Sequence, residues 1–388
     1  MSLVGGATAN AATQGALLDT VPLAAKSTIK YDLVAYTADG GFRATFASPH
    51  KFKSRVVSLQ KLVVTQQPVE QQPVEDQTTE VRQWVEVAKV KMTSKGEAVF
   101  KVAPVAGTTY RAVADTFTRT VKKKKVTETP VTTREVIVAE PAVRYTFDGP
   151  EVDWSFRKSN EFDAGGRLCA APSENNVSFV DGKAVLSVTK VTDKALINQV
   201  TKAAKAAQKK AKKKQVGCPD GVFHNAMLST VGAFSAKTGT VSARVKFPLG
   251  QGMHAGIWLQ SGDRSELDVA ESYGYGKGIT SGLHLKGKQY VKYILKKPLK
   301  KKSWWSKYHV ISVKWDQAKV SMWVDGVKVQ EVKKAKPDTR YFLVLSLLTS
   351  DWETVRMKKP IKGASGVKKP VLSTSKFYVD WIKYWDQV

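Results

Sequence analysis

The chain has 388 residues, of which 42% are hydrophobic and 25% are charged, so it can build a packed core and is not a wholly disordered chain. No apolar run reaches the roughly 18 residues of a membrane-spanning helix. The formal net charge of +28 favours an anionic surface or polymer as a partner, although net charge carries no information about the fold. The length predicts two domains, or three.

Residues 1–27 are predicted to be a disordered tail or the remnant of a signal peptide. Ala9-Asn10-Ala11 has the small-x-small form of a signal-peptidase site, yet no positive residue precedes Lys26 and the apolar run before the site is too short. One explanation is a start upstream of this sequence. The other is a flexible tail rich in Ala and Gly.

Residues 28–118 are predicted to form a small antiparallel β-sandwich, because their short segments alternate between apolar and polar residues or are rich in β-branched residues. The expected strands are 31–36, 55–64, 81–92, 98–102 and 109–114. A loop is expected at 66–77, where Gln-Pro-Val-Glu repeats. This part shows no catalytic pattern and is interpreted as a spacer or attachment module. A basic linker rich in Thr and Pro is expected at 119–143, with the domain boundary near Pro141.

Residues 144–388 are predicted to form one large antiparallel sandwich or jelly roll. The strands expected there are 183–188, 239–247, 255–259, 266–271, 308–315, 319–324, 341–347 and 376–384. An insertion rich in Ala and Lys, 195–215, is expected to be a helix, read either as a basic patch or as a solvated face. It lies between Cys169 and Cys218, which either form one bridge in an oxidising compartment or are two buried thiols.

Three carboxylates stand close together in this basic half: Glu266, Asp268 and Glu271. In a regular strand the first two share a face and Glu271 lies on the opposite one. A β-bulge at Val269-Ala270 would return Glu271 to the first face, with Leu267 and one bulge residue in the core. Cleaving a glycosidic bond with retention needs such a pair of carboxyl groups about 5–5.5 Å apart. A solvated strand edge and a calcium-binding loop are the alternatives.

Several motifs around this strand resemble glycoside hydrolase family 16, the jelly rolls that are similar to laminarinases and lichenases. The match covers residues 144–388 in consistent order. Its motifs are Glu266-Leu267-Asp268-Val269-Ala270-Glu271, Ala255-Gly256-Ile257-Trp258-Leu259, His284, Trp323-Val324-Asp325-Gly326 and Val379-Asp380-Trp381. The resemblance implies an all-β jelly roll, with an immunoglobulin-like module before it, in the style of secreted actinobacterial members.

By this resemblance Glu266 is the nucleophile, Asp268 its orienting partner and Glu271 the acid/base catalyst. One departure concerns substrate binding, because His254-Ala255 stands where many members have Trp-Pro. The candidates for contact with sugar are Trp258, Trp305, Trp352, His254 and His284. Each has a structural alternative, a core tryptophan or a hydrogen-bonding histidine. Trp304 and Trp305 alternate on a strand, so at most one can face the site.

No metal or other cofactor is expected, since no His and carboxylate spacing argues for zinc, and a structural calcium is not predicted from the sequence. Residues 272–315 contain 11 lysines and no arginine. This lysine-rich stretch suggests an anionic polysaccharide, such as a cell-wall polymer, as substrate or matrix; the alternative is a solubilising surface. A nucleic-acid partner is disfavoured, because interleaved aromatic and basic motifs are missing.

The sequence therefore predicts a secreted or cell-wall-associated, monomeric, retaining endo-glycosidase of β-linked polysaccharide, with a β-1,3- or β-1,3-1,4-glucan as the expected kind of substrate. A transglycosylase, or a polysaccharide-binding protein without activity on the same fold, is the alternative.

Overall fold

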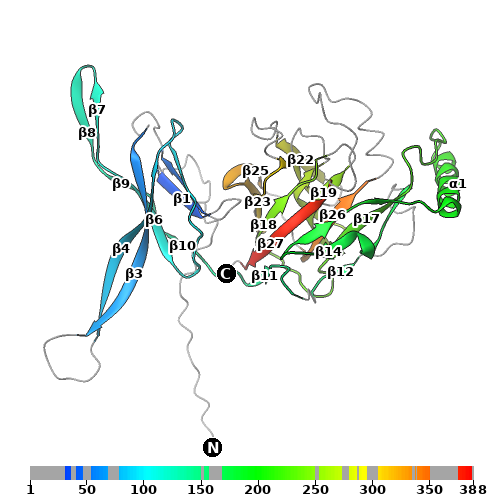
Figure 1. The fold of residues 1–388 in the computed structure, drawn as a ribbon, viewed down its shortest axis with the longest axis horizontal. Helices are drawn as coiled ribbons and strands as arrows, with labels where there is room; N and C mark the ends of the chain where they lie inside the picture. Colours follow the sequence, from blue (N-terminus) through cyan, green and yellow to red (C-terminus); the bar gives the residue numbers. More distant parts are fainter. Residues whose placement is uncertain are drawn as a thin grey trace, which may run out of the picture. The chain divides into compact units, whose positions relative to one another are not determined.

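The computed structural model describes residues 31–35, 41–46, 54–68, 78–149, 153–156, 168–249, 253–272, 279–285, 288–294, 305–333, 337, 339–349 and 375–386. The chain divides into two units, Met1–Glu140 and Pro141–Gln387 (Figure 1). Among the described residues, no helix is long and apolar enough to cross a membrane.

Unit 1 is built from strands in two main sheets. One sheet has the order β1-β2-β5, and the other has the order β10-β6-β3-β4 with β9 beside β6. The bounds are β1 Tyr31–Ala35, β2 Phe42–Phe46, β3 Val56–Pro68, β4 Thr78–Lys91, β5 Glu97–Phe100, β6 Thr109–Ala114, β9 Val131–Thr132 and β10 Val136–Ile137. Alternate residues of both sheets, such as Phe42 and Tyr110, are buried in one shared core. The two sheets therefore pack face to face.

Two expectations for unit 1 need correction, although residues 69–77 of the predicted loop lie outside the described residues. Gln66–Pro68 belong to β3 and pair with β4, so the strand continues into the predicted loop. Most of the predicted linker is folded: β7 (Phe117–Val121) and β8 (Lys124–Glu128) form a hairpin, and β9 and β10 pair with β6. Strands of two residues have no period that a sequence pattern can show.

The buried Arg55 holds the segment around this hairpin in place. Its guanidinium donates hydrogen bonds to the carbonyls of Ala114, at 3.1 Å, and of Asp115 and Thr129. These carbonyls precede and follow β7 and β8. A buried guanidinium needs such acceptors, so the hairpin ends are fixed by a contact with a residue about 60 positions earlier.

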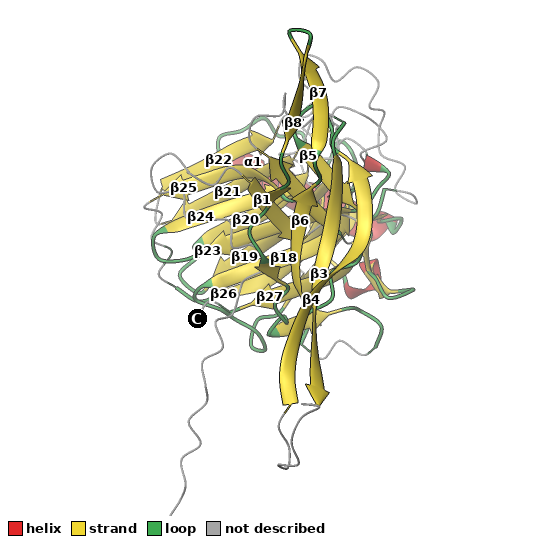
Figure 2. Cartoon of the chain, turned by 90° about the vertical axis from the view of Figure 1, so that its left-hand side faces the viewer, coloured by secondary structure: helices red, strands yellow, loops and turns green. Residues whose placement is uncertain are grey.

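Unit 2 consists of two large sheets, and the predicted all-β antiparallel sandwich is confirmed. The first has the order β14-β15-β27-β18-β23-β24-β25 with β11 beside β27. The second has the order β12-β17-β26-β19-β20-β21-β22, with β13 and β16 beside β17. Figure 2 shows β19, β20 and β21 side by side within it.

The strands of the first sheet are β11 Val143–Tyr145, β14 Val177–Phe179, β15 Ala184–Leu186, β18 Gly239–Lys246, β23 His309–Trp315, β24 Lys319–Val324, β25 Val327–Lys333 and β27 Phe377–Trp385. Those of the second are β12 Ser155–Phe156, β13 Ala170–Pro172, β16 Thr189–Lys190, β17 Phe223–Ser229, β19 His254–Ser261, β20 Glu266–Ser272, β21 Ile279–Leu285, β22 Lys288–Ile294 and β26 Tyr341–Leu348. A short 3-10 helix, η3, spans Glu174–Asn176.

The alternation along β19 and β26 decides which face of the second sheet is buried. Ala255, Ile257 and Leu259 of β19 lie in the core cluster with Leu343 and other alternate residues of β26. Burying each large aliphatic side chain contributes about 1.5–3 kcal/mol. The residues between them therefore point to the other face, which we call the outer face of this sheet.

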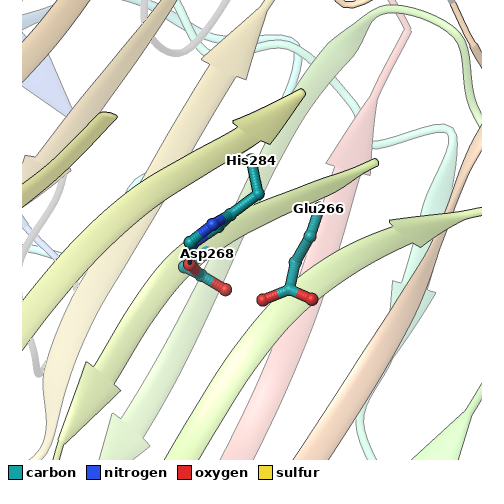
Figure 3. Close-up of side chains that lie close together, drawn as sticks. All are labelled: Glu266, Asp268 and His284. Atoms are coloured by element: carbon teal, nitrogen blue, oxygen red, sulfur yellow. Dashed lines mark hydrogen bonds and ion pairs between the residues drawn. The ribbon is translucent and has the colours of Figure 1, made fainter. Parts of the chain in front are cut away.

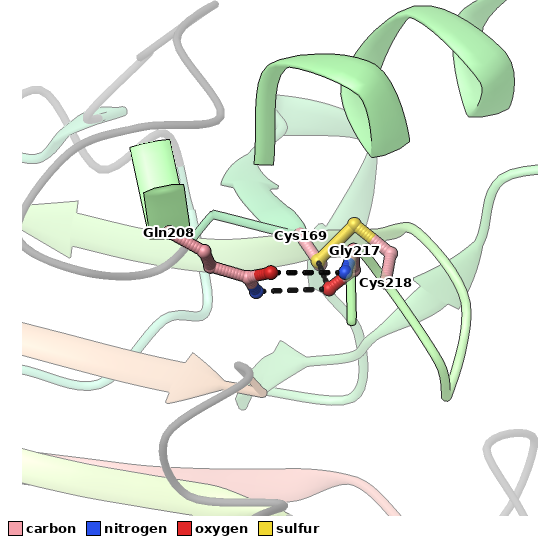
Figure 4. The surroundings of a disulfide bond; sticks show 4 residues. All are labelled: Cys169, Gln208, Gly217 and Cys218. Carbon is pink, nitrogen blue, oxygen red and sulfur yellow. Dashed lines mark hydrogen bonds between the residues drawn. A yellow bond between two sulfur atoms is a disulfide. The ribbon is translucent and has the colours of Figure 1, made fainter. Parts of the chain in front are cut away.

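The insertion between β16 and β17 contains the helix α1 (Lys194–Lys210). Asp193 caps it by accepting hydrogen bonds from the backbone N–H groups of Ala195 and Leu196. The predicted Cys169–Cys218 disulfide is confirmed and closes the insertion at its base (Figure 4). The bridge joins residues 49 positions apart, and a loop of this length predicts about 4 kcal/mol of stabilisation from chain entropy.

Replacing both cysteines by serine is expected to lower the free energy of unfolding of unit 2 by about 4 kcal/mol, because the unfolded chain regains the entropy of the open loop. Urea unfolding followed by tryptophan fluorescence measures it. Thiol reduction of the unmodified protein is the control and should lower the midpoint similarly. An unchanged midpoint in both experiments would contradict the prediction.

Candidate active site

The strand β20 contains the predicted bulge. Towards β19, Trp258 pairs with Asp268 and Ile257 pairs with Ala270, so Val269 is an extra residue without a partner in this register. Towards β21, Asp268 lies opposite Gly282 and Glu271 opposite Thr280. The bulge shifts Glu271 onto the outer face with Glu266 and Asp268.

The core side of the same strand differs in one detail from the prediction. Leu267, Val269 and Ala270 are all buried in the core cluster, so both bulge residues point inward, not one. These three apolar side chains hold β20 against the first sheet. A one-residue slip of the strand would bring charge into this core, so burial keeps the register.

Asp268 is the most enclosed of the three carboxylic acids, with 1% of the residue exposed. Burial raises the pKa of its carboxyl group well above the ordinary value, and the nearby charges of Glu271 and Glu266 raise it further. It also shares a hydrogen bond with the side chain of Glu266. Asp268 is therefore the member of the group whose neutral form is most favoured, and in that form its O–H donates to the Glu266 side chain.

His284 of β21 completes this side of the site. Its Nε2 lies 3.1 Å from Oδ2 of Asp268, and Figure 3 shows the side chains of Glu266, Asp268 and His284 turned toward one another. Their nearest ligand atoms all lie within 4.8 Å of one another, which is a spacing that could hold a metal ion.

Glu271 is held by residues from both neighbouring strands. Nε2 of His254, on β19, lies 2.6 Å from Oε1, and the hydroxyl of Thr280, on β21, donates to Oε2 at 3.2 Å. Burial raises the pKa of Glu271, but the hydrogen bonds and the charge of His254 outweigh it, so on balance the pKa is lowered. The clustering of charge thus raises proton affinity at Asp268, and not at the expected acid, Glu271.

Trp258 and Gly256 form the floor of the outer face beside these acids. Trp258 is half-buried, and its indole N–H donates to the hydroxyl of Ser346 at 3.2 Å. Gly256 lies opposite Glu271, and a Cβ there would come within 3.2 Å of Ser346 Oγ and 3.3 Å of the Trp258 ring. Glycine therefore allows Ser346 and the Trp258 ring to pack closely against the backbone opposite Glu271.

The remaining predicted sugar contacts have different outcomes. Trp305 is buried in the core cluster with 4% exposed, so its ring face is not available to a sugar and the prediction is wrong. Trp304 and Trp352 lie outside the described residues, as do 273–278, 286–287 and 295–304 of the lysine-rich stretch.

Thr280, Ser346 and Gly256 are site residues that sequence reasoning did not select. Each is a small side chain on a neighbouring strand, and only cross-strand register brings it to a carboxylic acid or to Trp258. The alternation of leucines in β26 marks Ser346 as an outer-face position. No signal in β21 could have selected Thr280, because five consecutive residues of that strand are buried.

Asp268→Asn is expected to raise the free energy of unfolding at pH 7 by about 1–2 kcal/mol. The native state keeps a proton on Asp268 that the unfolded state loses above the ordinary pKa of 3.8, so stability falls as the pH rises beyond 3.8. Asparagine needs no proton, and the gain should vanish near pH 3. Urea unfolding at both pH values measures it.

Glu271→Gln is the matched comparison and should change stability in the opposite direction. The lowered pKa of Glu271 stabilises the native state above the ordinary value of 4.5, and this contribution is lost as the pH falls through the folded pKa. Loss of the charged hydrogen bond to His254 should cost about 1–2 kcal/mol at pH 7. A change of the same sign in both variants would refute the opposite proton states.

The family model described as glycosyl hydrolases family 16 matches residues 173–381. No curated protein matches the chain.

Solved structures that are similar to this chain are so at low identity. The laminarinase catalytic domain from Thermotoga maritima MSB8 is 19% identical, with a TM-score of 0.46, over 64% of this chain and 99% of that one. An endo-beta-1,3-glucanase from Pyrococcus furiosus is 18% identical, with a TM-score of 0.47, over 70% and 98%. The laminarinase from Rhodothermus marinus is 17% identical, with a TM-score of 0.48, over 64% and 98%.

Proposed function

Because the chain belongs to family 16 of the glycosyl hydrolases, we propose that it is a retaining endo-glycosidase that cleaves β-linked polysaccharide by double displacement. The observation that carries the proposal is the bulge in β20, which places Glu266, Asp268 and Glu271 on one face of the sheet. Two carboxylic acids on the same side of a sugar are what retention needs: one attacks and one transfers the proton.

In the first step, the Glu266 carboxylate attacks the anomeric carbon and forms an ester, while the glycosidic C–O bond breaks. Glu271 gives its proton to the departing oxygen. In the second step, Glu271 takes a proton from water, the water oxygen bonds to the anomeric carbon, and Glu266 leaves as a carboxylate. Asp268 stays protonated throughout, and its O–H orients Glu266 without adding a second negative charge beside it.

His254 and Glu271 form a pair that stores the proton for the first step. In the free protein the hydrogen bond of 2.6 Å favours a carboxylate on Glu271 and the charge on His254. A polymer covering the pair would exclude water and disfavour separated charges, so the proton would move to Glu271 and leave a neutral imidazole. Glu271 is then a carboxylic acid in the complex with substrate, whereas it is a carboxylate in the free protein.

The ring of Trp258, the motifs of the chain and the disulfide support a proposal for the substrate class and the location of the protein. The half-buried ring of Trp258, on the same face as the three acids, suits the flat face of a sugar. The motifs of the chain resemble laminarinase and lichenase-like members, so β-1,3- and β-1,3-1,4-glucans are the substrates to test first. A disulfide favours an oxidising compartment, and we place the protein outside the cell or at the cell wall.

Glu266→Gln is expected to lower the release of reducing sugar from β-1,3-glucan by about a thousandfold or more, because the attacking group is lost. Added azide, a small nucleophile, should restore turnover in a Glu266→Ala variant and give a glycosyl azide of inverted configuration. Chain lengths of the products separate hydrolysis from transglycosylation. Polysaccharide binding by the unmodified protein without any product would instead favour a binding protein.

His254→Gln is expected to move the basic limb of the kcat/KM profile to lower pH. Glutamine cannot hold the proton that the pair stores, and a glutamic acid alone, with an ordinary pKa of 4.5, gives up its proton at lower pH than a histidine beside a carboxylate does. The matched control is His309→Gln, because His309 pairs with Asp325 at 2.7 Å in the other sheet. A shift in the control, or none in His254→Gln, would contradict the role of His254.

A further inference from the structure

The helix α1 and the turn after it expose a concentration of lysine that the glycosidase reaction does not use. We call the lysines of residues 194–216 the lysine platform. They are Lys194, Lys202, Lys205, Lys209, Lys210, Lys212, Lys213 and Lys214. All eight are exposed, and the same stretch contains no Asp or Glu. Among the described residues, none of the ion pairs includes a lysine of the platform.

The platform lysines point away from the body of unit 2. The buried side of α1 is made by Val200, Ala204 and Gln208, and Val200 packs in a small cluster with Val191 and Val222. The lysines occupy the other positions of the helix. Figure 1 shows α1 at the margin of unit 2, next to the start of β17.

The spacing of the lysines is unfavourable for the helix itself. Lys202, Lys205 and Lys209 are three and four residues apart, which brings their Cβ atoms to about 5–6 Å. Like charges at this spacing destabilise a helix, and an acidic residue at any of the intervening exposed positions would relieve the repulsion. Residues 194–216 contain no acidic residue, so the repulsion between these lysines is not relieved. A polyanion bound across the lysines would remove it.

The platform is held rigid before any ligand arrives. The side-chain amide of Gln208 donates to the carbonyl of Gly217 at 3.2 Å and accepts from its N–H at 3.0 Å, next to the Cys169–Cys218 disulfide (Figure 4). Gly217 has φ of +64°, and a Cβ there would lie 2.8 Å from Thr201 Cγ2, so glycine is required. Lysines 212–214 are therefore fixed beside the end of the helix, which reduces the ordering entropy of binding.

We propose that the lysine platform is a binding surface for an anionic polysaccharide, separate from the hydrolytic site. Residues 194–216 contain no Arg for bidentate contacts and no aromatic residue on which a base could stack, and these are the groups that nucleic-acid surfaces use. Lysines supply point charges that follow a chain of carboxylates or sulfates. Because α1 leads into β17 of the sheet that carries Glu266, a polymer held there stays close to the hydrolytic sheet.

The test compares two variants that remove equal charge from the full-length protein. The first carries Lys202→Gln, Lys205→Gln, Lys209→Gln and Lys210→Gln. The control carries glutamine at Lys122, Lys123, Lys124 and Lys125, the exposed turn of the β7–β8 hairpin in unit 1. Glutamine has nearly the helix propensity of lysine, so α1 should remain folded, and circular dichroism checks this.

Binding is measured by affinity electrophoresis in alginate, an anionic polysaccharide, across a range of salt concentrations. The platform variant should bind about tenfold more weakly at 0.1 M salt than the unmodified protein, with a smaller salt slope, while the control keeps most of its affinity. Glu266→Gln should bind as the unmodified protein does, which separates this surface from catalysis.

Three results would overturn the proposal. The first is equal loss of alginate affinity in both lysine variants, which would show that net charge alone accounts for the binding. The second is unchanged affinity in the platform variant. The third is a stronger, platform-dependent affinity for an oligothymidylate than for alginate, which would make the surface a nucleic-acid site. Failure of hydrolysis in the Glu266 experiments would leave these measurements unaffected.

Discussion

One extra residue in β20 is the feature on which the site depends. A regular strand would place Glu271 on the side of Leu267, and one of the two would be forced into the wrong environment. Because Val269 adds a position that β19 does not match, Leu267, Val269 and Ala270 all enter the core while Glu266, Asp268 and Glu271 face outward. The hydrophobic core therefore supplies the free energy that holds three acids together.

Three acids held this closely must differ in protonation, and their neighbours determine how. Asp268 is almost fully buried, and burial together with the charges of Glu271 and Glu266 raises its pKa well above the ordinary value. Glu271 is almost as enclosed, but His254 and Thr280 reach it from the strands on either side. Two side chains of similar chemistry, three residues apart, thus have pKa values shifted in opposite directions, because different residues of the neighbouring strands lie against each one.

The lysines of α1, the other charged region of unit 2, have surroundings unlike those of the three acids. In the site, every acid has a hydrogen-bonding partner and little water, whereas the lysines of α1 are exposed and have no acidic neighbour within the helix. Gln208, Gly217 and the disulfide tie that helix to the sheet that bears the acids. Unit 2 therefore carries an exposed, positively charged helix and a small, largely buried cluster of acids.

The sequence by itself determined the features that depend on local pattern. Alternation predicted eight strands of unit 2, the spacing of Glu266, Asp268 and Glu271 predicted the bulge, and the two cysteines indicated the bridge that the structure contains. Tertiary structure decided what depends on register and burial. It placed Trp305 in the core, folded most of 119–143 into a hairpin and short strands, and raised the pKa of Asp268. These outcomes rest on contacts between residues far apart in the chain, such as Arg55 with Thr129 or His254 with Glu271, and no local pattern records them.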